Sequence, residues 1–410
     1  MIPVSEASPW RLRFWLIFGG QALSLCGSSL TQFVLMWWIA DTTGSIAALS
    51  AAGLAALLPH ALCSPLGGVL ADRTSRRVLM LAADTVSALC MMVLIVLFVT
   101  DRVELWHVYG MMAVRGAMQA IQEPAAVASL VMLVPRTFLP RVGGFQQTLQ
   151  SLTQVVAAPL GAVAMSVMPV GWALSVDVAT ALLGVAPLLF FRVPQTRIPA
   201  EQRTGVLGEF ADGLRAVTRS RGLTHLFLVI AAGLLVVMPS LTLVPLLVKE
   251  HFAGGPGKVA LMEGVSGLGM IAGGMIVAAL APRRQVPWVL WGMVFSCLTL
   301  GLTGATPATL FGVAVFWWGI SGLAYSLSAA PCMVLLQLSV PNHLLGRVQS
   351  LFNMTLSLAA PVGLAVAALL GDSVAARTVF VTAGTLAAAV TALGILSPAL
   401  RGLDDMTARH

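Results

Sequence analysis

The sequence predicts an all-α integral membrane protein with twelve membrane-spanning helices, arranged as two pseudo-repeats of six. Three observations predict this class. Hydrophobic residues make up 58% of the 410-residue chain and charged residues 10%, whereas soluble proteins carry about 25% charged residues. Apolar stretches of the roughly 20 residues needed to cross a bilayer recur from end to end. The two halves of the chain also share spaced motifs.

The apolar stretches are expected to be helices, because a segment in lipid must satisfy its own backbone hydrogen bonds. A membrane barrel would show short alternating segments, which this sequence lacks. The first stretch is longer than a signal-peptide core and has no obvious cleavage site, so we expect it to be retained. The expected segments are 14–40, 46–70, 78–100, 105–133, 142–168, 171–191, 223–248, 259–281, 288–305, 308–338, 348–371 and 376–398.

The basic residues are distributed unevenly between the loops. Of the 23 Lys and Arg residues, 18 lie in one set of alternate loops and the termini, and four lie in the other set. By the positive-inside rule, both termini are expected in the cytoplasm, in a bacterial-type cytoplasmic membrane. The same asymmetry accounts for the net charge of +7, so no nucleic-acid partner is expected.

The longest polar stretch, residues 192–222, divides the chain into an N-terminal bundle, 1–191, and a C-terminal bundle, 223–410. Apolar residues recur in this linker at helical spacing, which predicts a short amphipathic helix at the cytoplasmic interface. Its apolar residues are Val206, Leu207, Phe210, Leu214 and Val217.

The two halves are related by an offset of 206 residues. A Val-Pro-x-x-x-Leu-x-Arg-Val motif begins at Val134 and recurs at Val340, and the same offset relates the glycine pairs 67–68 and 273–274. Repeated halves around a site near the bilayer midplane are typical of secondary transporters. A receptor or a membrane enzyme does not need such a duplication.

Residues 67–77 read GGVLADRTSRR, which resembles the G-x-L-a-D-r-x-x-r-r signature of the major facilitator superfamily. The segment from Gly20 to Trp38, followed by Pro59, resembles the third drug:proton antiporter branch of that family, which includes macrolide efflux pumps and siderophore exporters. The resemblance implies a proton-coupled antiporter that exports amphipathic small molecules such as drugs or siderophores by alternating access.

The signature loop is also expected to act as a conformational latch. Glycines let two helices approach closely, and Asp72 can meet a helix N-terminus or an arginine as one conformer closes. The second half has Ala278 in register with Asp72, so the latch is asymmetric. Alternatively, the arginines only determine topology. The latch residues are Gly67, Gly68, Asp72, Arg73, Arg76 and Arg77.

The fourth segment carries a charge at bilayer depth, which is costly and usually functional. One face of this segment presents Arg115, Gln119, Gln122 and Glu123. The family's R-x-x-Q-G motif is matched only in part, because Gln119 comes one place late. Glu123 is the expected proton-coupling acid beside Arg115, and Asp177 is the second candidate. The alternative is a polar stripe that stabilises helix packing.

Three other ionisable residues lie within the segments. Asp84 is interpreted as a packing residue or one that pairs with charge on the lipid side. Glu263 lies near the external end, and His60 is interpreted as a helix-packing histidine. The five cysteines fall in apolar segments without metal-ligand spacing, as small buried hydrophobes do.

Polar residues also recur on single faces of other segments, and lipid-facing sides should be apolar. These faces, one of which carries Ser321, Tyr325 and Ser328 in the tenth segment, are therefore expected to line a hydrated substrate cavity. The alternative is interhelical hydrogen bonding without substrate contact. The cavity candidates are Gln21, Ser28, Gln32, Gln119, Gln122, Gln147, Gln150, Gln154, Tyr325 and Asn353.

The fifth segment contains Ala158-Pro-Leu-Gly161, a degenerate form of the family's antiporter motif, which favours export. An importer or lipid-type transporter on the same fold, or a non-transporting sensor or scaffold, are the alternatives. The sequence has no phosphate-binding loop, metal-spaced cluster or nucleophile elbow. We therefore expect no enzyme activity, cofactor or metal. The expected partners are the substrate, protons and membrane lipids, and the expected state is a monomer.

The charge asymmetry makes a direct prediction about topology. Single cysteines placed in 101–104 and in 195–205, in a background without reactive native thiols, should differ in labelling by an impermeant thiol reagent applied outside intact cells. The first should be labelled and the second protected, because the basic loops remain in the cytoplasm. The reverse pattern would show that the orientation is wrong.

Overall fold

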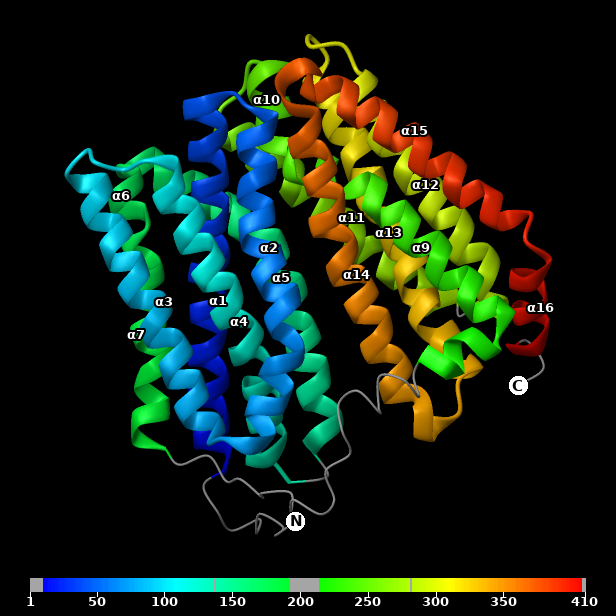
Figure 1. The fold of residues 1–410 in the computed structure, drawn as a ribbon, viewed down its shortest axis with the longest axis horizontal. Helices are drawn as coiled ribbons and strands as arrows, with labels where there is room; N and C mark the ends of the chain where they lie inside the picture. Colours follow the sequence, from blue (N-terminus) through cyan, green and yellow to red (C-terminus); the bar gives the residue numbers. More distant parts are fainter. Residues whose placement is uncertain (1–9, 136–137, 192–213, 281, 408–410) are drawn as a thin grey trace. The chain divides into compact units, whose positions relative to one another are not determined.

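The computed structural model describes residues 10–135, 138–191, 214–280 and 282–407 (Figure 1). Within these ranges the chain is helical, with turns and short connections and no strand. The helices form two compact units. The first unit consists of Met1–Thr42 and Ala52–Arg203, and the second consists of Thr43–Ala51 and Thr204–His410.

The first unit contains the helices that match the first six predicted segments. The sixth segment is broken at Leu174, where the short α6 ends and α7 begins. Helix α3 packs against α4, α6 and α7. The helices are α1 (Trp10–Thr43), α2 (Ile46–Arg73), α3 (Arg76–Val99), α4 (Leu105–Leu133), α5 (Leu139–Val167), α6 (Val170–Ala173) and α7 (Ser175–Phe190).

The second unit contains the helices that match the remaining six segments. The seventh segment is broken at Leu243, and a short helix that was not predicted follows the twelfth. Helix α12 packs against α13 and α15, and α9 packs against α14 and α15. The elements are α9 (Arg221–Thr242), α10 (Val244–Glu250), α11 (Pro256–Leu280), α12 (Gln285–Ala305), α13 (Phe311–Ser339), α14 (Asn342–Leu370), the 3-10 turn η3 (Gly371–Ser373), α15 (Ala376–Ile395) and α16 (Pro398–Thr407).

In the described part of the chain, eleven helices are long and apolar enough to cross a membrane. Helix α4 is not among them, because its charged and amide side chains lower its hydropathy. It has 29 residues, and at 1.5 Å per residue it is about 43 Å long, which is enough to span the hydrocarbon core. The predicted all-α membrane class is confirmed.

The two units repeat one helix contact at the 206-residue offset. In the first unit α2 and α4 approach so closely that a Cβ atom on Gly67 or Gly116 would overlap a backbone carbonyl oxygen of the facing helix. In the second unit α11 and α13 approach in the same way at Gly273 and Gly322. Small residues allow such backbone proximity between membrane helices. The sequence repeat therefore corresponds to a repeated packing contact within each unit.

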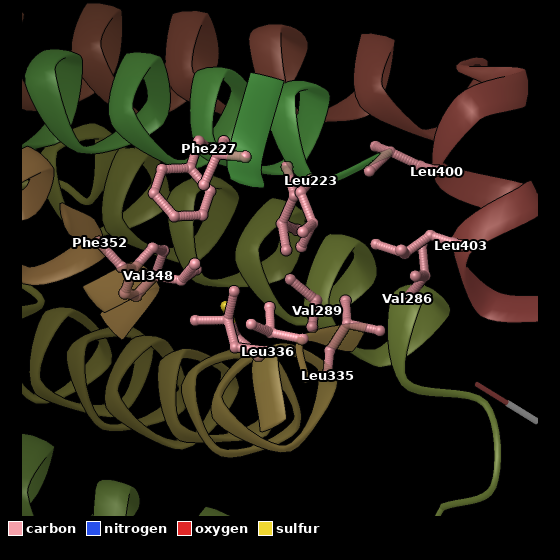
Figure 2. Packing of buried hydrophobic residues seen from close by; sticks show 14 of the residues in the cluster. Leu223, Phe227, Val286, Val289, Leu335, Leu336, Val348, Phe352, Leu400 and Leu403 are labelled. Atoms are coloured by element: carbon pink, nitrogen blue, oxygen red, sulfur yellow. The ribbon is translucent and has the colours of Figure 1, made fainter. Parts of the chain in front are cut away.

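Each unit has its own apolar core. In the second unit, side chains from α9, α12, α13, α14 and α16 interlock (Figure 2). Leu400 and Leu403 are fully buried there, which explains why the amphipathic α16 folds back onto its unit. Val217, in a helical stretch at 214–219, joins this core. The rest of the amphipathic helix expected in the linker lies outside the described residues.

The glycine contact between α2 and α4 can be tested with a matched pair of substitutions on α4. Gly116→Ala places a methyl group against the Ala56 carbonyl oxygen, and overpacking of this kind costs about 1–3 kcal/mol. Gly110 has open space around its Cβ position, so Gly110→Ala should be neutral or slightly stabilising. Apparent melting temperatures in detergent measure both effects. Equal melting temperatures for the two variants would contradict the close approach.

Candidate functional site

The first unit brings α1 and α7 together at a glycine. A Cβ atom on Gly27 would overlap the Thr180 hydroxyl oxygen and would lie 3.3 Å from the Asp177 Cα atom. Because Gly27 allows this approach, the adjacent Ser28 reaches the Asp177 side chain. The Ser28 Oγ atom donates a hydrogen bond to Asp177 Oδ1 at 3.0 Å.

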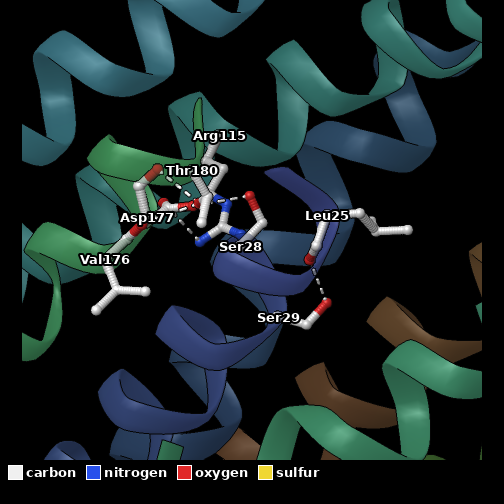
Figure 3. Close-up of polar contacts among 7 residues, drawn as sticks. All are labelled: Leu25, Ser28, Ser29, Arg115, Val176, Asp177 and Thr180. Atoms are coloured by element: carbon white, nitrogen blue, oxygen red, sulfur yellow. Dashed lines mark hydrogen bonds and ion pairs between the residues drawn. The ribbon is translucent and has the colours of Figure 1, made fainter. Parts of the chain in front are cut away.

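The same carboxylate is paired with the cation of α4. Arg115 Nη1 lies 3.9 Å from Asp177 Oδ2 (Figure 3). The two side chains are 13% and 10% exposed, so neither charge is well solvated and each requires the other. Asp177 also lies in the first turn of α7, where the helix dipole favours a negative charge.

A second polar cluster surrounds Asp84 on α3. The Gln122 amide donates to Asp84 Oδ1 at 2.5 Å and to Gln21 Oε1 at 3.3 Å. Gln21 in turn donates to the Gly184 carbonyl oxygen at 3.5 Å. Asp84 is only 6% exposed, and its Oδ2 atom is buried without a hydrogen-bond partner among the described residues. This cluster joins α1, α3, α4 and α7.

The two clusters form parallel layers in the first unit. On α1 they are separated by seven residues, from Gln21 to Ser28, and on α4 by seven, from Gln122 to Arg115. On α7 the same spacing separates Gly184 from Asp177. Seven residues are two helical turns, or about 10 Å. The layers are therefore in register across three helices, although α1 runs in the opposite direction to α4 and α7.

The polar face predicted on α4 is divided by the packing. Arg115 and Gln122 point into the unit, whereas Gln119 and Glu123 are exposed. The Glu123 side chain is 53% exposed, and its Oε2 atom lies 3.7 Å from Nε2 of His60, which is 25% exposed. The ion-pair partner of Arg115 is Asp177 rather than Glu123.

The arginines of the signature loop bind helix ends within the first unit. Arg76 donates to the Ala128 carbonyl oxygen at 3.1 Å and to the Ala71 carbonyl oxygen at 3.4 Å. Arg77 donates to the Leu188 and Leu189 carbonyl oxygens. These hydrogen bonds connect the start of α3 to α4 and to the end of α7. The structure does not describe the side chains of Asp72 and Arg73.

The predicted cavity residues fall into four groups. Gln21, Ser28 and Gln122 are engaged in the two polar layers, and Gln32 is half-buried. The side chains of Gln147 and Gln154 are not described. The exposed candidates are Gln119, Gln150, Tyr325 and Asn353.

The second unit uses two of its predicted polar residues for packing. Ser321 on α13 and Ser296 on α12 donate to each other's backbone carbonyl oxygens at 2.9 Å and 3.0 Å. Ser328 donates to the Val289 carbonyl oxygen at 2.7 Å. These serines therefore form interhelical hydrogen bonds, which was the alternative to lining a cavity. Among the described residues, no group of three or more His, Cys, Asp and Glu could hold a metal ion.

Sequence reasoning did not find the Asp84 cluster, because it treated Asp84 as a packing or lipid-side residue. In the structure Asp84 points into the unit and is bound by Gln122. The signal that could have found it is the shared seven-residue spacing of polar residues on α1 and α4. That spacing indicates two polar layers, and Asp84 lies at the depth of one of them.

Comparison with known proteins gives the family and the fold. Residues 17–289 match the family described as the Major Facilitator Superfamily. Macrolide efflux protein A of Streptococcus pyogenes is 28% identical over 96% of this chain and 98% of its own length. Enterobactin exporter EntS of Citrobacter koseri is 26% identical over 82% of this chain and 79% of its own length. The crystal structure of nucleoside transporter NupG superposes with a TM-score of 0.69 at 12% identity, covering 95% of this chain and 99% of that one.

The Arg115–Asp177 pair can be tested by a double-mutant cycle. Asp177→Asn or Arg115→Gln alone leaves one buried charge without its partner, which costs about 3–5 kcal/mol. The double variant removes both charges, so its apparent melting temperature should recover much of the loss. Thermal unfolding of the four purified proteins in one detergent measures this coupling. Strictly additive losses would show that the two side chains do not interact.

Proposed function

The chain belongs to the Major Facilitator Superfamily, and from this premise we propose that it is a proton-coupled exporter of amphipathic small molecules such as drugs or siderophores. Like its relatives, it is a multi-pass membrane transporter rather than an enzyme. Relatives named for efflux of macrolides and export of enterobactin support the outward direction. An importer or lipid-type transporter is the alternative, and a sensor or scaffold is disfavoured by these relatives.

The observation that carries the proposal is the buried Arg115–Asp177–Ser28 cluster inside the first unit. Ionisable residues within membrane helices are costly and mark ion or substrate pathways. An antiporter without a nucleotide site needs an acid that alternates between two protonation states. Asp177, held by Arg115, and Glu123, exposed beside His60, are the proton-coupling candidates.

Substrate recognition is assigned to the polar residues that are not used for packing. The exposed Gln119, Gln150, Tyr325 and Asn353 are the candidates that remain free to meet a substrate, together with Gln32. An amide or hydroxyl group can bind polar atoms of an amphipathic molecule while neighbouring apolar side chains contact the rest. This mode of binding suits compounds as different as a macrolide and a siderophore.

Conformational switching is assigned to the signature loop. Arg76 and Arg77 attach the start of α3 to α4 and α7, so a movement at this loop is transmitted to the helices that carry Arg115 and Asp177. Asp72 is proposed as the charge that latches one conformer. The orientation proposed is both termini in the cytoplasm of a bacterial-type cytoplasmic membrane, with the chain acting as a monomer.

Transport into everted vesicles tests the function. Vesicles containing the purified protein, with an acidic interior, should accumulate a macrolide or a catechol siderophore against its gradient, because protons leaving the vesicle drive substrate in. A protonophore should abolish this accumulation. Asp72→Asn should insert normally but slow transport.

Two results would contradict the proposal. Accumulation that survives the protonophore would show that protons do not drive transport. Accumulation only in right-side-out vesicles would show an importer. Unchanged flux in a well-inserted Asp72→Asn variant would leave the export proposal intact and remove the latch.

A further inference from the structure

Asp84 is a buried acid that has no ion-pair partner among the described residues. Gln122 binds one carboxyl oxygen, and the other is buried without a hydrogen-bond partner among the described residues. A buried carboxylate without a countercharge is costly by several kcal/mol, whereas the neutral acid avoids most of that cost. The surroundings of Asp84 therefore suit a bound proton.

The charged groups of α3, α4 and α7 are engaged elsewhere, and those of α1 lie eight or more residues from Gln21. On α3, Arg76 and Arg77 donate to backbone carbonyl oxygens. On α4, Arg115 is paired with Asp177, and Glu123 lies beside His60 of α2. On α7 the charged group is Asp177 itself, which has the same sign as an ionised Asp84. The two buried acids of the first unit thus lie in opposite environments, one with a cation and one without. Environments that separate two acids in this way assign them different protonation states.

Apolar side chains close the Asp84 layer toward the Trp10 end of α1. One helical turn from Gln21, Asp84 and Gly184 lie the fully buried Ile17, Met80 and Leu188, respectively. These three side chains belong to the first unit's core. A proton on Asp84 is therefore shielded from water on that side in the conformation described.

The Gln122 side chain can serve both protonation states of its partner. Its amide nitrogen donates to a carboxylate, and after rotation by 180° its amide oxygen accepts from a carboxylic acid. An arginine or lysine in this place would hold Asp84 permanently ionised. A glutamine permits the proton to come and go without leaving the carboxyl group unbound.

We infer that Asp84 is the residue that binds the transported proton. It holds the proton as a neutral carboxylic acid in the conformation described and releases it to water when the layer around Gln122 opens. Asp177 remains the ion-pair partner of Arg115. The inference rests on the proposed function, since it names the proton site of the same exporter, and it places that site on neither Glu123 nor Asp177.

Infrared spectroscopy of the full-length protein in lipid tests the inference without transport. A step to alkaline pH should remove a carbonyl-stretch band of a protonated, buried carboxyl group in the wild type. The band should lose intensity in Asp84→Asn and keep the Asp84 contribution in Asp177→Asn and in Glu263→Gln. A band of unchanged intensity in Asp84→Asn, or no band in the wild type at neutral pH, overturns the inference.

Proton-driven substrate accumulation provides a second test of the Asp84 assignment. In everted vesicles, Asp84→Asn should lower proton-driven accumulation to the level of protein-free liposomes, while substrate exchange without a gradient continues. Asp101→Asn is the matched control. Asp101 is an exposed acid with a φ of 53°, a conformation that asparagine also adopts. Substrate accumulation by the Asp101→Asn variant should therefore equal that of the wild type.

The outcomes separate the two proposals. Normal proton-driven accumulation by Asp84→Asn overturns the assignment of Asp84 and leaves the exporter in place. Loss of proton-driven accumulation in Glu123→Gln, with accumulation retained in Asp84→Asn, would assign the proton-binding site to Glu123. If the wild type itself shows no proton-driven accumulation, the proposed function fails, and the infrared band still decides whether Asp84 binds a proton.

Because the substitution removes an uncompensated acid, Asp84→Asn should fold with an unchanged or higher apparent melting temperature.

Discussion

The interior of the first unit depends on the compensation of one buried cation, the Arg115 guanidinium. A charge at this depth in a helix bundle is stable only with a partner, and Asp177 and Ser28 complete the cluster. That requirement joins α4, α7 and α1. The close approach at Gly27 makes it possible, since any side chain there would push α7 away from α1.

The same helix register determines what surrounds Asp84. Because α1, α4 and α7 are aligned by the Arg115 cluster, their residues two turns away form the second layer with Gln21 and Gln122. Arg115 lies two helical turns, or about 10 Å, from the Gln122 layer on α4, so it does not neutralise Asp84. Among the described residues, one unit therefore contains a buried acid that is paired with a cation and a second buried acid that is not.

Much of the fold could be predicted from the sequence, because apolar length, basic loops and the repeated motif are local or periodic properties. The break at Leu174 could not, since no proline lies within four residues of it. The break at Leu243 had a signal that was not used, because Pro239 and Pro245 flank it. The importance of Arg115 was predictable from its charge alone. Its partner was not, because helical geometry places Glu123 on the same face of α4, while the choice of Asp177 depends on which helix packs against that face.

The partner of Arg115 can be measured directly by solid-state NMR in lipid bilayers. Protein labelled with ¹⁵N in arginine guanidinium groups and with ¹³C in aspartate carboxyl groups reports dipolar couplings between the two at contact distance. A coupling from a buried carboxylate should be lost in Asp177→Asn and retained in Asp84→Asn. A coupling that survives Asp177→Asn and disappears in Asp84→Asn would show that Arg115 binds Asp84, and both the layering and the proton site would be wrong.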